Sequence, residues 1–413
     1  MNKLEELIQE LCPNGVKYRT VGDICNICRG VVISKDFIRD NVGAYPVYSS
    51  QTENNGELGK INTYSFDGEY LTWTTDGANA GSVFYRNGKF SVTNVCGVLE
   101  MKDNNISAKF LFYVLQTSVK PYVNKGMGNP KLMSNVMARV KVPVPPIEVQ
   151  EEIVRILDKF TELTAELTAE LTARKKQYEF YRDQLLSFNS INDTTNNRTG
   201  GGYNHLLNCQ VKWVRLGDLA LVTKLAGFEF TKYVKYSNSG QIIALRGLNV
   251  KNGQLDLTDV KYIDESDLSK LDRSKLKKGD LLFTYVGTVG QVALINEDEK
   301  FYLAPNVALI RITNEGVLPD YLRYYCQSNI FYKKEILRLI QASSMQNIPM
   351  EKIRKFVVPV PPIEEQKRIV AILDRFDKLC NDISEGLPAE IDARQKQYEY
   401  YRDKLLTFEE IAQ

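Results

Sequence analysis

Two nearly identical stretches decide the architecture: VPVPPIEVQEEIVRILDKF, which starts at Val142, and VPVPPIEEQKRIVAILDRF, which starts at Val358. A second pair lies downstream, ARKKQYEFYRDQLLSF from Ala173 and ARQKQYEYYRDKLLTF from Ala393. The copies are 216 residues apart in the first pair and 220 in the second. Matches this dense identify an internal repeat, which has to be found before the rest of a fold is assigned. The chain is therefore predicted to consist of two halves built on one plan.

The repeat continues more weakly through the sequence between these stretches. VKYRTVGDI at Val16 resembles VKWVRLGDL at Val211, and LTWTTDG at Leu71 resembles LLFTYVG at Leu281. The remaining matches are Asn94-Val95 with Asn306-Val307, and Leu111, Tyr113 and Gln116 with Leu322, Tyr324 and Gln327. Each half is thus predicted to be one globular domain followed by one helix. Because the helices are close copies and the domains only distant ones, the domains should share a scaffold but recognise different things.

A long helix is predicted after each junction. Pro145-Pro146 and Pro361-Pro362 close the globular domains, because the residue before a proline disfavours helix, and helix can begin at Glu148 and Glu364. Residues 148–188 would span roughly 60 Å at about 1.5 Å per residue. Steps of three and four residues along this helix are typical of a coiled-coil seam. The seam positions are Leu157, Phe160, Thr164, Leu167, Leu171, Arg174, Tyr178, Tyr181, Leu185 and Phe188.

The second helix repeats the seam with one irregularity. Its step from Ile383 to Leu387 to Ile391 inserts four residues, and Gly386 and Pro388 at the same place predict a local break. Two seams in one chain are most simply explained by antiparallel packing on each other, although two independent helices, each covering its own domain, would also fit. The seam positions are Leu373, Phe376, Cys380, Ile383, Leu387, Ile391, Arg394, Tyr398, Tyr401, Leu405 and Phe408.

The distribution of charge follows the same division. Basic side chains outnumber acidic ones by 16 to 13 in residues 1–147 and by 23 to 17 in residues 189–363, whereas acidic ones lead by 9 to 6 in 148–188 and by 12 to 8 in 364–413. A positive bias confined to the globular parts fits two domains that face a polyanion, although ordinary surface variation could produce it too. The sequence contains no run of 18 apolar residues, so no membrane span is predicted. The seven cysteines are scattered, which suits a reducing cytoplasm.

The residues needed for catalysis are missing. The single histidine, His205, lies in the polar, glycine-rich stretch 190–205, which is predicted to be a linker and excludes His-based triads. Cys25 and Cys28 have no partner pair for zinc. The chain contains no phosphate-binding GxxxxGK[ST] loop, no dinucleotide fingerprint and no methyltransferase Asn-Pro-Pro-aromatic motif. We therefore expect no metal, no cofactor and no catalytic residue in this chain.

The duplicated VPVPPIExQ junction, the helices that end in YRDxLLxF and the two divergent domains resemble the specificity subunits of type I restriction-modification systems. The opening LEELIQELCPNGVKYRTVGDI and the tandem TAEL at 164–171 are also similar to that family, so the resemblance covers essentially the whole chain. It implies a non-catalytic, cytoplasmic DNA-recognition subunit with pseudo-twofold symmetry. Two modification subunits would dock on it, bind S-adenosylmethionine and methylate an adenine in each half of a split target. Separate restriction subunits would supply ATP-driven translocation and cleavage.

The fold class that follows is α+β, with two target-recognition domains separated by two long helices packed as an antiparallel coiled coil. The predicted segments are 1–146 for the first domain with a short N-terminal helix, 147–188 for the first spacer helix, 189–210 for the linker, 211–362 for the second domain and 363–413 for the second spacer helix. A scaffold whose domains bind protein is the main alternative, and salt-dependent DNA binding would distinguish the two. A self-contained methyltransferase or nuclease is a further alternative, and the missing motifs argue against it.

Candidate DNA-contacting residues surround two predicted glycine turns, at Gly77 and Gly81 and at Gly287 and Gly290. Asn and Gln can bond adenine, while Arg and Lys can bond guanine or phosphate, although turn or surface roles are equally possible for each residue. Two equivalent loops before the junctions, Gly126–Lys131 and Ser343–Asn347, add candidates, because similar loops in the family lie close to DNA. The DNA-binding candidates are Thr74, Thr75, Asn79, Asn129, Lys131, Thr284, Tyr285, Thr288, Gln291, Ser344 and Gln346. The spacer and docking candidates are Leu157, Phe160, Leu167, Leu171, Tyr178, Tyr181, Leu373, Phe376, Tyr398 and Tyr401.

Overall fold

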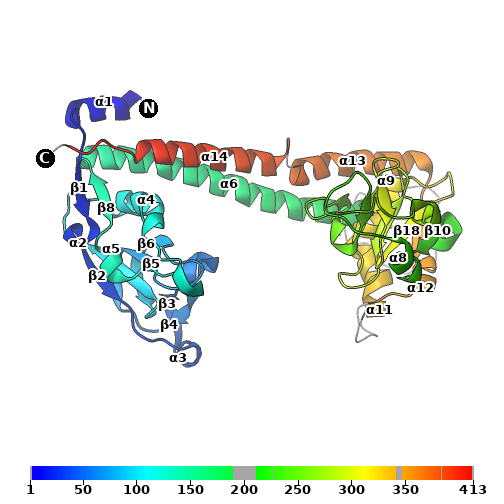
Figure 1. Cartoon of the computed structure of the whole chain (residues 1–413), viewed down its shortest axis with the longest axis horizontal. Coiled ribbons are helices and arrows are strands. Elements are labelled where there is room, and N and C mark those ends of the chain that lie inside the picture. The colour runs from blue at the N-terminus through cyan, green and yellow to red at the C-terminus, as the bar shows by residue number, and fades with distance from the viewer. Residues whose placement is uncertain (1, 189–210, 226, 341–346, 383, 412–413) are drawn as a thin grey trace, which may run out of the picture. The chain divides into compact units, whose positions relative to one another are not determined.

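The computed structural model describes residues 2–188, 211–225, 227–340, 347–382 and 384–411, and Figure 1 labels its elements. These residues form two compact units, which we call unit 1 (1–168 with 390–413) and unit 2 (169–389). Each unit therefore contains one globular domain together with parts of both helical regions. The predicted linker 189–210 lies outside the described residues.

In the described part of unit 1, the main sheet has six strands in the order β2-β7-β5-β6-β3-β4. The central strand β5 pairs antiparallel with β6 and β7, and β3 runs parallel to β6. A separate antiparallel ladder joins β1 to β8, so the beginning and the end of the domain meet. The strands are β1 (Lys17–Thr20), β2 (Cys25–Arg29), β3 (Val42–Tyr48), β4 (Glu57–Ile61), β5 (Phe66–Thr74), β6 (Val83–Val92), β7 (Cys96–Met101) and β8 (Lys141–Val144).

The helices of unit 1 cover its sheet and complete its core. The hydroxyl of Ser107 caps α4 by accepting a hydrogen bond from the backbone N–H of Phe110, and the apolar face of α4 packs on β5, β6 and β8 (Figure 1). Trp73 is fully buried beside Gly97, where a Cβ atom would come within 2.1 Å of the indole ring. The helices are α1 (Asn2–Leu11), α2 (Val21–Ile24), α3 (Lys35–Asp40), α4 (Ala108–Ser118) and α5 (Ser134–Met137).

Among its described residues, unit 2 contains a four-stranded sheet in the order β10-β18-β15-β16 and a three-stranded sheet in the order β14-β11-β17. Two short ladders, β12-β13 and β9-β19, complete the pairing. The strands are β9 (Lys212–Arg215), β10 (Ala220–Lys224), β11 (Ile243–Leu245), β12 (Val250–Lys251), β13 (Gln254–Leu255), β14 (Lys261–Tyr262), β15 (Leu281–Thr284), β16 (Val292–Leu294), β17 (Phe301–Leu303), β18 (Val307–Ile312) and β19 (Val357–Val360).

Aromatic residues form the core of unit 2. Phe331 packs edge-on against Phe356 with ring centroids 5.3 Å apart, and the buried hydroxyl of Tyr321 donates to the carbonyl of Pro359 at 2.8 Å. The helices of the globular part are α7 (Leu216–Leu219), α8 (Gly227–Tyr233), α9 (Pro319–Gln327), α10 (Asn329–Phe331), α11 (Leu337–Ile340) and α12 (Met350–Arg354). Among the described residues, no helix combines the length and the apolar character that crossing a membrane requires.

The long helices begin at the repeated junctions and one of them is interrupted. Helix α6 runs over Ile147–Leu185, and the second helical region consists of α13 (Ile363–Asn381) and α14 (Leu387–Leu405). The predicted break is confirmed, and Gly386 is required there because a Cβ atom would lie 2.6 Å from the carbonyl oxygen of Lys378. Helices α6 and α13 start at Ile147 and Ile363, directly after the proline pairs and one residue before Glu148 and Glu364.

Aromatic residues of the predicted seams contact neighbouring helices within each unit, while the seam residue Ile383 lies outside the described residues. In unit 1, the ring of Phe160 stacks on Tyr401 with centroids 5.5 Å apart, and the hydroxyl of Tyr398 donates to Gln116 at 3.3 Å. In unit 2, Phe376 stacks on Tyr181 at 5.8 Å and lies 6.4 Å from the ring of Tyr178. The aromatic positions of the repeat therefore attach each helix end to a neighbouring helix.

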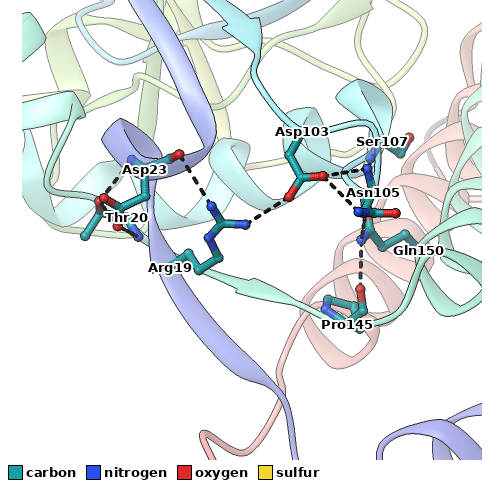
Figure 2. Close-up of polar contacts among 8 residues, drawn as sticks. All are labelled: Arg19, Thr20, Asp23, Asp103, Asn105, Ser107, Pro145 and Gln150. Atoms are coloured by element: carbon teal, nitrogen blue, oxygen red, sulfur yellow. Dashed lines mark hydrogen bonds and ion pairs between the residues drawn. The ribbon is translucent and has the colours of Figure 1, made fainter.

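A buried glutamine of the repeated PPIExQ motif holds the start of each long helix, and Figure 2 shows the first of the two, Gln150. The amide nitrogen of Gln150 donates to the carbonyls of Pro145 at 2.8 Å and Asn105 at 3.0 Å, and its oxygen accepts from the Ser107 N–H at 2.9 Å. Gln366 makes the same bonds in unit 2, to Pro361 at 2.8 Å, Gly316 at 2.7 Å and Leu318 at 2.9 Å. In each unit this amide forms hydrogen bonds with backbone groups of two segments at once, the loop before α4 or α9 and the turn at the proline pair.

Replacing Gln150 by leucine should lower the free energy of unfolding of unit 1 by about 2–4 kcal/mol, because three backbone groups, of which the Pro145 carbonyl belongs to a buried residue, lose their partner. Trp73 and Trp213 are the two tryptophans, one in each unit, so in a Trp213→Phe background Trp73 fluorescence reports urea unfolding of unit 1. Gln9→Leu, on the exposed side of α1, is the matched control and should change stability by less than about 0.5 kcal/mol. Equal stability of the two variants would contradict a structural role for the amide.

Candidate nucleic-acid interface

A tight turn follows β5 in unit 1 and β15 in unit 2, and a threonine hydroxyl closes each one. The Thr74 hydroxyl donates to the carbonyl of Asn79 and accepts from the Ser82 N–H at 3.0 Å. The Thr284 hydroxyl donates to the carbonyl of Thr288 at 2.5 Å and accepts from the Gln291 N–H at 2.9 Å. Both threonines are buried, and their hydroxyls hold the two turns together.

The glycines of these turns have the backbone conformation that the sequence predicted. Gly77 and Gly81 have φ of 95° and 88°, and Gly287 and Gly290 have φ of 79° and 92°. A Cβ atom at Gly77 or Gly287 would have no other atom within 4 Å. Glycine is therefore favoured at these two positions by the positive φ and not by a lack of space. The prediction of tight turns is confirmed.

The chain returns beside each turn just before the repeated junction. The N–H of Leu132 donates to the carbonyl of Thr75 at 2.9 Å, and in unit 2 the N–H of Ile348 donates to the carbonyl of Tyr285, also at 2.9 Å. The two loops predicted to be equivalent therefore lie beside the same turn in their own units. Asn129 is exposed in the first loop, whereas Ser344 and Gln346 lie outside the described residues.

In unit 1 the surface beside the turn carries a small network of charges. The guanidinium of Arg29, at the end of β2, donates to the Thr75 hydroxyl at 2.6 Å and lies 3.5 Å from the carboxylate of Asp76. The amine of Lys131 also lies 3.5 Å from Asp76. Thr75 is buried under this network, whereas Lys131 and Asn79 are exposed, and Asn79 donates to Thr52 at 3.2 Å. Two cations share one carboxylate, which leaves a net positive surface for phosphate.

In unit 2 the corresponding positions carry different side chains. Lys224, at the end of β10, lies over the buried ring of Tyr285 with its amine 5.4 Å from the centroid, and burial raises the pKa of that tyrosine. Thr288 is exposed, and the side-chain oxygen of Gln291 accepts from the Asn252 N–H at 3.2 Å. A pocket of about 750 Å³ opens next to the turn and is lined by Thr284, Thr288 and Gln291 among others.

The strand registers correct one sequence match. Thr74 pairs with Cys96 across β5 and β7, and Thr284 pairs with Val307 across β15 and β18. Val307 therefore corresponds to Cys96 and not to Val95. Asn94-Val95 and Asn306-Val307 therefore do not occupy equivalent positions. They are one residue out of the alignment that the backbone hydrogen bonds of the strands impose.

The Cys25 and Cys28 side chains differ in their surroundings. Cys25 is buried against Met101, and this burial raises the pKa of its thiol to about 12, so the thiol stays protonated near neutral pH. Cys28 is exposed on the same strand. In the residues that the structure describes, no group of three His, Cys, Asp or Glu side chains is placed to hold a metal ion.

The spacer and docking candidates lie mostly inside the units. Leu157, Tyr178 and Leu373 are buried, and the other candidates are half-buried along the helices. The helices also expose two large aromatic residues that sequence reasoning missed, Phe180 with 58% of its surface accessible and Tyr400 with 64%. The repeat itself contained the signal, since YEFYRD and YEYYRD place these residues at matching positions.

Two globular domains of one scaffold carry turn-centred polar surfaces that differ in their side chains, an arrangement that fits a two-part recognition protein. The chain belongs to the family of type I restriction modification DNA specificity domains, whose sequence profile matches residues 13–174 and 209–393. It is a type I specificity subunit, the non-catalytic DNA-recognition component of a restriction-modification system.

Individual relatives support this assignment across the chain. A Mycoplasma pneumoniae protein assigned as a type I specificity subunit is 34% identical over 386 residues, which cover 93% of this chain and 96% of that protein. The specificity subunit of the type I restriction enzyme MpnII, from the same organism, is 43% identical over 190 residues, covering 45% of this chain and 57% of that subunit.

Two solved structures share the fold. The S subunit of a type I restriction-modification system from M. genitalium has a TM-score of 0.55 at 14% identity and covers 95% of this chain and 96% of its own. A chain from a study of complex assembly and conformational transition of the type I R-M system has a TM-score of 0.60 at 15% identity, covering 96% of this chain and 98% of its own.

Proposed function

We propose that each unit reads one half of a bipartite DNA site. The observation that carries this proposal is that equivalent places on one scaffold hold different side chains. Arg29 corresponds to Lys224, and Thr75 corresponds to Tyr285, because each cation lies against the residue that follows the turn threonine. A shared scaffold with divergent polar surfaces is what two readers of different half-sites require, since base edges are distinguished by their donors and acceptors.

The long helices then act as the spacer between the readers. We infer that they pack as an antiparallel coiled coil and relate the two halves by a pseudo-twofold axis. In support, Phe160 in the first half of α6 contacts Tyr401 near the end of α14, while Tyr181 near the end of α6 contacts Phe376 in α13. Reversed order along the two partners is the signature of antiparallel packing. The segments predicted from the sequence, including the spacers 147–188 and 363–413, belong to this proposal.

The partners of the assembly are two modification subunits, restriction subunits and double-stranded DNA. In this proposal the chain holds no cofactor of its own, and the modification subunits bind S-adenosylmethionine. The exposed aromatic rings of Phe180 and Tyr400 support a docking role, because exposed residues of this size are typical of interfaces and these two are repeat equivalents, one for each modification subunit. The cysteines of the described chain are unpaired, which suits the cytoplasm as the place of action.

The test is methylation by the reconstituted assembly. With a modification subunit and S-adenosylmethionine, the chain should confer adenine methylation on one bipartite sequence, whereas the purified chain alone should transfer no methyl group. Binding of the assembly to DNA should weaken steeply as salt rises, because phosphate contacts release counterions. Methyl transfer by the isolated chain, or methylation without sequence preference by the assembly, would contradict the proposal.

A further inference from the structure

The pocket beside the turn of unit 2 contains an arginine that sequence reasoning did not single out. Arg246 follows β11 and lines this pocket of about 750 Å³ together with Tyr236, Lys251 and Gln291. Aromatic, cationic and amide side chains thus converge on one opening. The side chain of Arg246 is 23% exposed, so it is accessible from the pocket while most of its length is covered.

Arg246 is held at both ends. Its backbone N–H donates to the side chain of the fully buried Asn249 at 3.0 Å, and its Nη2 donates to the Asp259 carbonyl at 2.8 Å and the Asp259 carboxylate at 3.0 Å. Both of these side-chain bonds use Nη2, and Nε is buried with no hydrogen-bond partner among the described residues. The buried Nε cannot reach an external base, but Nη1 forms no hydrogen bond among the described residues, so the guanidinium that Asp259 fixes in place keeps Nη1 for an acceptor that is not part of this chain.

The equivalent position in unit 1 is occupied by a serine. Thr93 N–H donates to the carbonyl of Tyr48 at 2.8 Å, and Ala304 N–H donates to the carbonyl of Leu245 at 3.1 Å, so the following residues, Ser49 and Arg246, correspond. The Ser49 hydroxyl accepts from Thr93 at 3.2 Å and stays within the domain. Since one scaffold accommodates either residue, the fold alone does not require arginine at this place.

Two asparagines with a left-handed backbone line the pocket, Asn252 with φ of 49° and Asn306 with φ of 72°. Asn252 and Gly253 form the two-residue turn of the β12-β13 hairpin, where this conformation is the ordinary one for an Asn-Gly pair. Asn252 is tied to the turn after β15 through its N–H bond to Gln291. The pocket wall is therefore preorganised and continuous with the turn.

We propose that Arg246 determines the specificity of unit 2 by donating hydrogen bonds to a guanine in its half-site, an inference that rests on the proposed function of the chain. Arginine is donor-only, and guanine is the base that presents two adjacent acceptors, O6 and N7, in the major groove. Lys251 is exposed at the rim of the same pocket, where its amine pairs with Asp256 at 2.6 Å, and in this proposal it adds positive charge that positions the domain on phosphate without specifying sequence.

The experiment compares Arg246→Ala, Arg246→Lys and the control Lys270→Ala in the reconstituted assembly. Lys270 is an exposed cation of unit 2 that does not line the pocket, so its loss removes the same charge. Each complex methylates a DNA library in which both half-sites are randomised, and sequencing reports the preference at every position. Arg246→Ala should lose about 10- to 100-fold of the preference for guanine at one position of one half-site. Arg246→Lys should lose most of this guanine preference, and Lys270→Ala should keep the preference of the wild type.

The controls separate the possible failures. In the isolated chain with a Trp73→Phe background, Trp213 fluorescence reports that each variant is folded, and unchanged preference in the other half-site reports that it is assembled. If Arg246→Ala and Arg246→Lys both keep the wild-type preference, or if the affected position is not guanine, the assignment of Arg246 is wrong while bipartite recognition stands. If the wild-type assembly itself shows no bipartite preference, the proposed function fails. If Arg246→Ala does not fold, Arg246→Lys carries the test, because lysine keeps the positive charge beside Asp259.

Discussion

Replacing residues 21–142 with the corresponding segment of a related specificity subunit should change one half of the methylated site and leave the other half unaltered. The segment holds the whole six-stranded sheet and the turn with Arg29, Thr75 and Lys131, whereas unit 2 supplies the second turn from its own residues. Because the two sets of polar residues share no side chain, the two readouts should be independent.

The exchange succeeds only if the donor keeps the contacts that cross the cut points. Arg19, which stays, forms an ion pair with Asp103 of the replaced segment at 3.1 Å. The Tyr113 hydroxyl donates to Asp158 at 2.7 Å, and Gln116 accepts from Tyr398. Val142 lies within β8 and pairs with Arg19 of β1, so a donor joined there must preserve the strand register.

Sequencing of methylated adenines in a strain that carries the hybrid measures the outcome. A return exchange, in which the original segment is restored, should recover the original site and serves as the control. If both half-sites changed together, the domains would not read independently, and the division of recognition between units 1 and 2 would have to be abandoned.

The features that the sequence predicted well are those that local pattern controls. Repeated proline pairs predicted both junctions, Gly386 predicted the break between α13 and α14, and glycines predicted the two tight turns. In each case the signal comes from the backbone conformation of one or two residues, which Pro and Gly restrict or permit directly. Seam residues were identifiable for a similar reason, because helical periodicity alone determines which side of a helix faces its neighbours.

The roles of site residues could not be predicted in the same way. Thr74 and Thr284 are polar residues beside a turn, as base-contacting residues would be, but their hydroxyls are used by the turn itself. Arg246 lies in a sequence without any motif, and its place becomes evident only when β11 pairs with β14, which brings Asp259, and with β17, which brings the residues beside the turn. Whether a polar group is satisfied within the fold depends on contacts between distant segments, which periodicity does not contain.

Deletion of Thr168–Leu171, the second TAEL copy in α6, should shorten the spacer between the two methylated half-sites by one base pair. Under the proposed arrangement the helix separates the two readers, so its length controls their separation. Four residues remove about 6 Å at about 1.5 Å per residue. With about 3.5 residues per turn in a coiled coil, one end also rotates by roughly 50° beyond a full turn.

DNA geometry converts this change into base pairs. One base pair advances about 3.4 Å and turns about 35°, at roughly 10 base pairs per turn. Translation therefore corresponds to between one and two base pairs, and rotation to between one and one and a half, so the single value compatible with both is one. Some loss of stability should accompany the deletion, because four residues form a stutter and not a heptad, and the seam has to adapt locally.

Two further variants provide the controls, one that keeps the length of α6 and one that increases it. Thr168→Ala removes the hydroxyl that bonds the Thr164 carbonyl at 2.8 Å but keeps the length, so its spacer should equal that of the wild type. Insertion of a third TAEL copy should lengthen the spacer by one base pair. Methylated sites mapped by sequencing give both half-sites and the distance between them. Unchanged spacing after the deletion, with both half-sites intact, would mean that the tandem only fills the seam and that something other than the length of α6 determines the separation of the readers.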